Sequence, residues 1–162
     1  MRRDVGFVGN EDDGDALVAI HDAVRPCTPS AVIENVFAAA FRGGAALPGL
    51  PVADTLKRVD SQQRVTETVA RQGLWQAQTP QVFRRDWLLE AYAKRATLGN
   101  NITDDAQLVE ALGHPVQMLT GSPLNMKITA HEDLKIATLF AKVKENETPV
   151  RPLRAFEDER FS

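Results

Sequence analysis

Two charged residues that could do chemistry, Asp22 and Arg25, follow the short apolar run at residues 17–20 in the stretch VAIHDAVRP. An aspartate carboxylate with open neighbours suits Mg²⁺, which keeps several waters and bridges to substrate phosphates. Asp22 could equally accept hydrogen bonds from a following turn, and Arg25 could clamp an anion or simply pair with Asp22. The neighbouring His21 is more often a structural histidine than a catalyst. The stretch therefore predicts either a metal and anion site or a charged turn.

A second group of polar residues, Thr55, Arg71 and Lys127, contains a hydroxyl, a guanidinium and an ammonium group. These are the donors that a phosphate monoester prefers. The segment from residue 54 to residue 85 carries six basic and three acidic residues, which suits a small anionic ligand as well as a solvated basic face. The sequence alone does not bring the three residues together.

The composition limits the classes of function. The chain has 162 residues, 43% hydrophobic residues and a formal net charge of −3, which is typical of one globular domain and argues against a general nucleic-acid binder. The single cysteine, Cys27, cannot form an internal disulfide, lacks a sequence-evident base, and belongs to no zinc-binding pattern. No apolar stretch approaches the ~20 residues of a membrane span. We expect a soluble protein of the cytoplasm, or of the plastid stroma in a plastid-bearing organism.

The elements that must position these residues begin with a buried strand at residues 17–20, and ligands bind at the carboxyl ends of strands in open parallel sheets. Thr28 as N-cap and Pro29 at the first position predict a helix that ends at Gly43 or Gly44. The helical spacing predicts one buried face: Ile33, Val36, Phe37, Ala40 and Phe41. A second strand should follow at residues 45–52, at a sheet edge or a strand end because it contains two prolines.

The segment ADTLKRVDSQQRVTETVARQGLW has two Val- and Thr-rich stretches on either side of the polar turn at residues 60–64. It is typical of a β-hairpin, which we interpret as a protruding arm at about residues 53–74. A lone two-stranded hairpin is only marginally stable in water, so it needs a third surface. That surface could belong to its own domain or to the same arm of a second subunit.

The second half of the chain predicts a helix near residues 86–95 and a short helix capped by Thr103 or Asp104, for which capping is favoured over a ligand role. Two short strands are expected in PVQMLTG and NMKIT. A Thr129–Glu132 capping box should begin a last helix, with four residues pointing inward: Leu134, Ala137, Phe140 and Val143. We expect one domain at residues 1–144, a flexible tail at residues 145–162, and an α/β fold with a mostly parallel sheet.

Five fragments occur in an order and spacing that resemble one enzyme family: HDAVRP, DTLKR, GLWQAQTPQVF, ITDDA and NMKIT followed by EDL. The family is the 2-C-methyl-D-erythritol 4-phosphate cytidylyltransferases of non-mevalonate isoprenoid synthesis. The resemblance covers most of the chain, from about residue 17 to residue 143. It implies a Rossmann-like fold of the nucleotidyltransferase and glycosyltransferase A type, and a homodimer that forms through the projecting β-arm.

The resemblance also implies a reaction and its residues. Such enzymes join CTP to a branched polyol phosphate, release pyrophosphate and use Mg²⁺. It assigns the metal to Asp22, catalytic support to Arg25 and Lys127, and substrate binding to Lys127 and Thr79. The arm residues Thr55 and Arg71 would reach the polyol phosphate in the partner subunit's site. No nucleic-acid or membrane partner is implied.

One part of the family pattern has no counterpart in the chain. Family members begin with a strand and a glycine-rich basic loop that wraps the CTP triphosphate, and MRRDVGFVGN does not match it. We therefore expect an N-terminally incomplete fold that lacks most of the nucleotide site and the central strand beside that site, and low activity of the chain alone. The alternatives are a cytidylyltransferase for ribitol 5-phosphate or a related polyol phosphate, and a non-catalytic dimerising or substrate-binding fragment.

Overall fold

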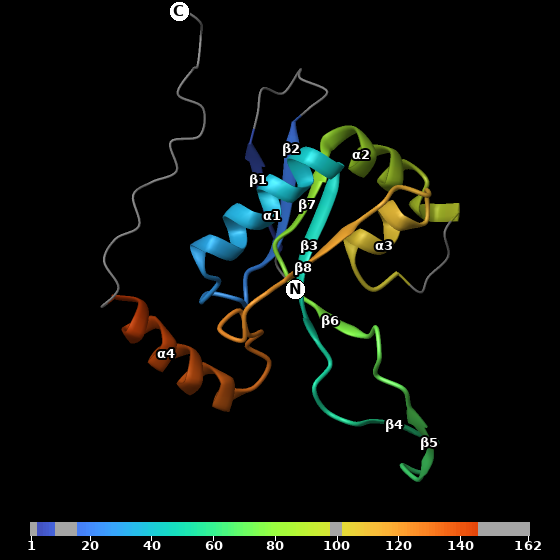
Figure 1. The fold of residues 1–162 in the computed structure, drawn as a ribbon, viewed down its shortest axis with the longest axis vertical. Helices are drawn as coiled ribbons and strands as arrows, with labels where there is room; N and C mark the ends of the chain where they lie inside the picture. The colour runs from blue at the N-terminus through green and yellow to red at the C-terminus, as the bar shows by residue number, and fades with distance from the viewer. Residues whose placement is uncertain (1–2, 9–15, 98–101, 146–162) are drawn as a thin grey trace, which may run out of the picture.

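The computed structural model describes residues 3–8, 16–97 and 102–145, and its centre is a six-stranded sheet (Figure 1). The strand order is β1-β2-β7-β3-β6, and β8 pairs with β3. The strands are β1 (Arg3–Val8), β2 (Leu17–Asp22), β3 (Ala45–Pro51), β6 (Trp75–Ala77), β7 (Gln81–Arg84) and β8 (Gln117–Thr120).

The sheet is mixed. β7 pairs antiparallel with both β2 and β3, while β8 pairs parallel with β3. The strands β2, β3 and β8 therefore run in one direction, as the alternation of strands and helices predicts, and β7 is inserted against them. Because β7 is antiparallel to β2, the residues just before β7 lie beside the residues just after β2, at the end of the sheet formed by the carboxyl end of β2.

Helices cover both faces of this sheet: α1 (Ser30–Gly43) on one side, α2 (Arg85–Ala93) and α3 (Asp105–Glu110) on the other (Figure 1). Alternate residues of β2 point to opposite faces, so Leu17 joins the α1 cluster whereas Val18 joins the α2 and α3 cluster. A 3-10 turn (Arg95–Thr97) follows α2. The predicted α/β class is confirmed by these two cores around one sheet.

The first helix differs from its prediction in two details. Thr28 is not the N-cap, because Pro29 takes that position and the Thr28 hydroxyl donates to Asn125 instead. The buried face is rotated, since Val32 and Ala39 are buried whereas Phe41 is 65% exposed. Gly44 ends the helix as predicted, with φ at 90°.

The proline-containing strand β3 is central, and the prediction of an edge position was wrong. It pairs with β7 through Ala45 and Ala46 and with β6 from Gly49 to Pro51, so Pro48 lies between the two ladders. On that side of β3 the ladder therefore needs no N–H donor at position 48, and proline, which has none, is tolerated there. Pro51 does end the strand.

Two further predictions need correction. NMKIT forms no strand: its Asn125 and Ile128 N–H groups donate to the carbonyls of Ser122 and Val24, and no ladder runs along it. The N-terminal stretch, which does not match the family's first strand and loop, does contain a strand: β1 pairs antiparallel along all of β2. The expected tail at residues 145–162 begins at a residue that instead ends the last helix, and residues 146–162 lie outside the described residues. Among the described residues, no helix has the length and apolar character required to cross a membrane.

The predicted arm is present as a separate antiparallel pair, β4 (Leu56–Val59) and β5 (Val65–Val69), which projects away from the central sheet (Figure 1). Asp60 closes its turn by accepting backbone N–H bonds from Gln62 and Arg64. The bond from the Arg64 backbone is the main cause that lowers the pKa of Asp60. Both faces of the arm are solvent-exposed, including large apolar residues on the arm and at its base: Val59, Val65, Leu74 and Trp75.

The last helix, α4 (His131–Glu145), stands beside the sheet edge rather than on a face of it (Figure 1). Ala137 is buried as predicted, but Leu134 is exposed because the helix contacts the body only along a narrow stripe. Val143 is outside the part whose side chains are described. The N-terminal cap comes from Asp133, not from Glu132, since the Asp133 carboxylate accepts from the backbone N–H groups of Thr129 and Ala130.

This capping makes a direct prediction. Replacing Asp133 by alanine should speed hydrogen exchange at the Thr129 and Ala130 amides by roughly five- to tenfold at neutral pH. The two amide bonds, that of Thr129 first, lower the pKa of Asp133, so its contribution is present above the unfolded pKa and is lost as the pH falls through the folded one. Glu132→Ala is the control and should leave exchange at both amides unchanged. Equal effects of the two substitutions would restore the predicted capping box.

Candidate active site

The candidate site begins at the end of β2, where two cations meet one carboxylate. Oδ2 of Asp22 is 3.3 Å from Nε of Arg25 and 3.3 Å from Nζ of Lys127. β2 delivers Asp22 to the sheet edge, and the turn after it returns Arg25 to the same point through a bond from the Arg25 N–H to the Asp22 carbonyl. Residues 105 positions apart are thus joined across one ion-pair cluster.

The two cations differ in exposure. The side chain of Arg25 is 10% exposed, and its Nη1 donates to the backbone carbonyl of Asn125 at 2.7 Å. The side chain of Lys127 is 36% exposed. Lys127 is therefore the cation that can turn from Asp22 to an incoming anion, whereas Arg25 is committed to holding Asp22 and the loop that carries Lys127.

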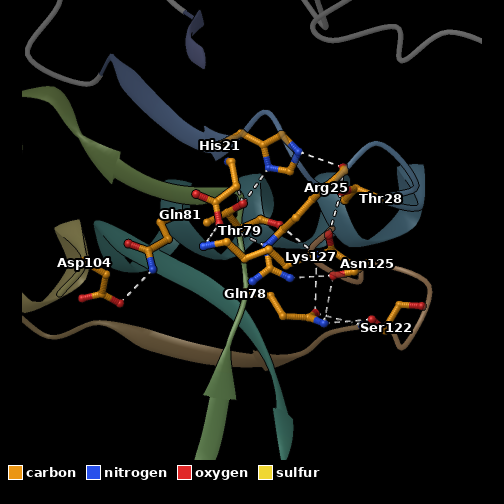
Figure 2. A network of polar contacts seen from close by, with 11 residues as sticks. His21, Arg25, Thr28, Gln78, Thr79, Gln81, Asp104, Ser122, Asn125 and Lys127 are labelled. Atoms are coloured by element: carbon orange, nitrogen blue, oxygen red, sulfur yellow. Dashed lines mark hydrogen bonds and ion pairs between the residues drawn. The ribbon is translucent and has the colours of Figure 1, made fainter. Parts of the chain in front are cut away.

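Thr79 lies at the same edge because it precedes the antiparallel strand β7 (Figure 2). Its Oγ1 accepts the backbone N–H of Asp22 at 3.0 Å and lies 2.8 Å from Nδ1 of His21. Nε2 of His21 lies 3.3 Å from the carbonyl of Arg25, which can only accept. A neutral His21 therefore carries its proton on Nε2, and the Thr79 hydroxyl donates to Nδ1. His21 orients Thr79, as its structural interpretation predicts.

Two buried amides that sequence reasoning missed connect these segments: Asn125 and Gln78 (Figure 2). Both stand in quoted motifs, NMKIT and GLWQAQTPQVF. The sequence offers one signal for these two amides, which is their position one or two residues from Thr79 and Lys127. That signal does not show that an amide side chain is buried, so it does not separate Asn125 and Gln78 from surface residues.

The arm residues do not join this cluster within one chain. Arg71 donates from Nη1 to the carbonyl of Ala53 at the base of the arm, and Thr55 is exposed nearby. The structure thus brings together Asp22, Arg25, Thr79 and Lys127 of the predicted residues, and leaves Thr55 and Arg71 on a projection. Their assignment to a substrate stays a prediction.

The side chains of the Asp22 cluster suit a hard cation held by few protein ligands. None of them is suited to act as a nucleophile. No group of three or more His, Cys, Asp or Glu side chains within the described ranges could hold a metal together. Asp22 supplies one carboxylate, whose Oδ2 makes both ion pairs, and Mg²⁺ is often held by one or two carboxylates plus substrate phosphates. Cys27 is buried and its Sγ donates to the carbonyl of Ala137, so it has no access to a substrate. The arrangement can bind and orient phosphate groups.

Comparison with known proteins agrees with this chemistry. The family described as 2-C-methyl-D-erythritol 4-phosphate cytidylyltransferase (IspD) matches residues 8–142. The curated protein of that name from Syntrophus aciditrophicus is 44% identical over 131 residues, which are 81% of this chain and 56% of that protein. The one from Rhodopirellula baltica is 50% identical over 121 residues, 75% of this chain and 48% of that protein.

Solved structures show the same fold. The 2-C-methyl-D-erythritol 4-phosphate cytidylyltransferase from Thermus thermophilus matches with a TM-score of 0.71 and 40% identity over 78% of this chain and 62% of that one. The one from Francisella tularensis matches with a TM-score of 0.73 and 31% identity. The predicted nucleotidyltransferase-type fold is confirmed, and the chain spans about half the length of the curated relatives it matches. The chain belongs to the 2-C-methyl-D-erythritol 4-phosphate cytidylyltransferase family.

Proposed function

We propose that the Asp22 cluster binds a phosphorylated polyol, 2-C-methyl-D-erythritol 4-phosphate, for the transfer of CMP from CTP. The convergence of Arg25 and Lys127 on Asp22 at the end of β2 carries this proposal. It supplies positive charge, a half-exposed ammonium and a carboxylate at the sheet edge where α/β folds bind ligands. The names of the curated relatives supply the substrate.

The proposed chemistry is an in-line displacement. A phosphate oxygen of the polyol phosphate attacks the α-phosphorus of CTP, a new P–O bond forms, and the bond from the α-phosphorus to the bridging oxygen breaks to release pyrophosphate. The protein's work is to position two anions and to offset their charge. Lys127 is placed to bind the attacking phosphate, and Arg25 holds Lys127 and Asp22 in register.

Mg²⁺ is the proposed cofactor, and it would neutralise charge on the phosphates when bound. Oδ1 of Asp22 is the group that would hold it, because Oδ2 is occupied by Arg25 and Lys127. With only one protein carboxylate, the ion would depend on substrate oxygens and water for its other ligands.

We further propose a homodimer in which each arm completes the partner's site. The arm is a two-stranded sheet with exposed apolar residues, and such a sheet needs another surface. Thr55 and Arg71 stand on it as a hydroxyl and a guanidinium without a place in their own chain's cluster. A two-fold pair would use both arms in the same way.

Ligand binding tests the proposed substrate. Titration calorimetry with Mg²⁺ present should give a dissociation constant at least about tenfold lower for 2-C-methyl-D-erythritol 4-phosphate than for ribitol 5-phosphate or inorganic phosphate. Binding is the first measurement because the matched residues cover only 56% of the curated relative's length. Turnover is then followed by pyrophosphate release with CTP. Equal affinities for all three ligands would contradict the assigned substrate.

Arg71→Ala should weaken binding of the polyol phosphate by roughly 1.5 to 3 kcal/mol, the usual contribution of a charge-assisted hydrogen bond. Arg58→Ala is the matched control, since Arg58 lies on the same arm but pairs with Glu67. An unchanged affinity in the Arg71 variant, with the control equally unaffected, would remove Arg71 from the site.

Mixing two inactive variants tests the shared site. Arg71→Ala alters the arm, and Lys127→Gln alters the part of the site on the central sheet. A homodimer of either variant therefore has no complete site. Mixed dimers regain one complete site of two, and random exchange should restore about a quarter of wild-type binding capacity. No recovery after demonstrated subunit exchange would place the arm and the body of one chain in the same site.

A further inference from the structure

Among the residues whose burial is described, one polar side chain is fully buried and belongs to no assigned role. Asn125 has 0% exposed surface and lies two residues before Lys127. A buried amide costs free energy unless its donors and acceptors are paired. Asn125 is fully paired, and its partners come from two other segments of the chain.

The contacts of Asn125 join three segments that carry the candidate site (Figure 2). Its Nδ2 donates to the carbonyl of Thr79 at 2.8 Å, and its Oδ1 accepts from the Thr28 hydroxyl at 2.8 Å. Its backbone carbonyl accepts from Nη1 of Arg25 at 2.7 Å. The loop after β2, the link before β7 and the loop that carries Lys127 therefore meet at one residue.

Gln78, from the link before β7, also hydrogen-bonds the loop that carries Lys127. Its Nε2 donates to the carbonyl of Ser122 at 2.9 Å and to that of Asn125 at 3.3 Å, and its Oε1 accepts the Ser122 N–H at 3.3 Å. Gly121 leaves the room that this amide needs, since a Cβ there would stand 2.2 Å from the Gln78 Oε1 atom. The loop is thus fixed at both of its ends before Lys127.

We propose that Asn125 is a positioning residue that sets Arg25 and Lys127 at the distance from Asp22 seen here. Arg25 contacts the backbone carbonyl of Asn125, which every substitution at this position keeps. Any change in Arg25 after the side chain is removed therefore reports movement of the loop and not the loss of a direct contact. The proposal rests on the proposed function only for its ligand-binding consequence.

The first measurement uses the ligand-free, ¹⁵N-labelled full chain. Asn125→Ala should raise the rate of water exchange of the Arg25 Nε–H proton at least about tenfold, because unpaired buried groups draw water into the network. Thr28→Val removes the hydroxyl that donates both to Oδ1 of Asn125 and to the Arg25 carbonyl, and it should raise the rate several-fold. Thr28→Ser keeps that hydroxyl and should restore the wild-type rate. If Asn125→Ala does not fold, Asn125→Ser, which also removes the amide and keeps the backbone carbonyl, carries the test.

Tyr92→Phe is the structural control. It removes another hydrogen bond to a buried side chain, from the Tyr92 hydroxyl to Asp105, between α2 and α3. It should lower the melting temperature and leave Arg25 exchange unchanged. If the Asn125 and Thr28 variants also lower only the melting temperature, their role is structural and the proposal is overturned.

The second measurement is the dissociation constant for 2-C-methyl-D-erythritol 4-phosphate. It should rise about tenfold in Asn125→Ala and stay constant in Tyr92→Phe. If the wild-type chain does not bind this ligand but the exchange rates change as expected, the proposed function fails and the positioning role stands. If the ligand binds equally well to all variants and Arg25 exchange is constant, the positioning role fails alone.

Discussion

Replacing Asp22 by asparagine should reduce magnesium-dependent turnover by about 10³-fold, because it removes the carboxylate that is proposed to hold Mg²⁺ and that pairs with the two cations. The same substitution leaves Arg25 buried beside an uncharged partner, and breaking such a pair should lower the free energy of unfolding by about 3 kcal/mol. Both effects come from the ion-pair cluster at the end of β2. Pyrophosphate release and urea unfolding measure them.

A third readout separates the metal role from stability. Without its carboxylate the site is more positive, so inorganic phosphate should bind the Asp22→Asn variant at least as tightly as the wild type. Asp86→Asn is the control for charge: it removes one carboxylate that pairs with the exposed Arg84 at the start of α2, and it should leave turnover unchanged. Parallel losses of phosphate affinity and turnover in Asp22→Asn would mean that the site collapses, and Asp22 would lose its assignment as metal ligand.

Gly44→Ala should destabilise the fold by at least about 3 kcal/mol, through backbone strain and overpacking together. Gly44 has φ at 90° after α1, and an added Cβ would stand 2.2 Å from the Trp87 ring. That ring stacks on His114 with centroids 4.1 Å apart, so it cannot retreat freely. Urea unfolding measures the loss.

Substitutions at two other glycines separate the contribution of backbone strain from that of overpacking against Trp87. Gly113 also has a positive φ, but an added Cβ there meets nothing within 4 Å, so Gly113→Ala should cost only about 1 kcal/mol. Gly43 has open space and an ordinary φ, and Gly43→Ala should change stability by less than about 0.5 kcal/mol. If Gly44→Ala cost no more than Gly113→Ala, the Trp87 contact would contribute nothing.

Much of the fold and part of the site could be predicted because local signals dominate there. The run at residues 17–20, the glycine at position 44 and the polar turn at residues 60–64 each specify a strand, a helix end or a hairpin by short-range physics. Asp22 could be predicted as a site residue because it is a charged residue that directly follows a buried apolar strand. The fold class follows from the same signals.

The remaining features depend on contacts that the sequence does not encode locally. Proline favours an edge, but Pro48 is central because two different strands share one side of β3. NMKIT has strand-like residues, but its Asn125 is used for side-chain bonds to Thr28 and Thr79 instead of a ladder. The Thr129 and Glu132 spacing suits a capping box, but Asp133 reaches the same amides. In the first two cases a tertiary partner overrides the local preference, and in the third the carboxylate one residue further along the chain replaces the predicted one.

The insertion of β7 between β2 and β3 also constrains the order of folding. β2 and β3 share no ladder, so the middle of the sheet cannot close until Gln81–Arg84 has been synthesised and placed. The arm lies in the intervening chain and must be looped out, which adds closure entropy to the pairing of β2 and β3 through β7. A nascent chain that ends within the arm would leave the β7-facing sides of both strands unpaired, and unpaired strand edges favour aggregation.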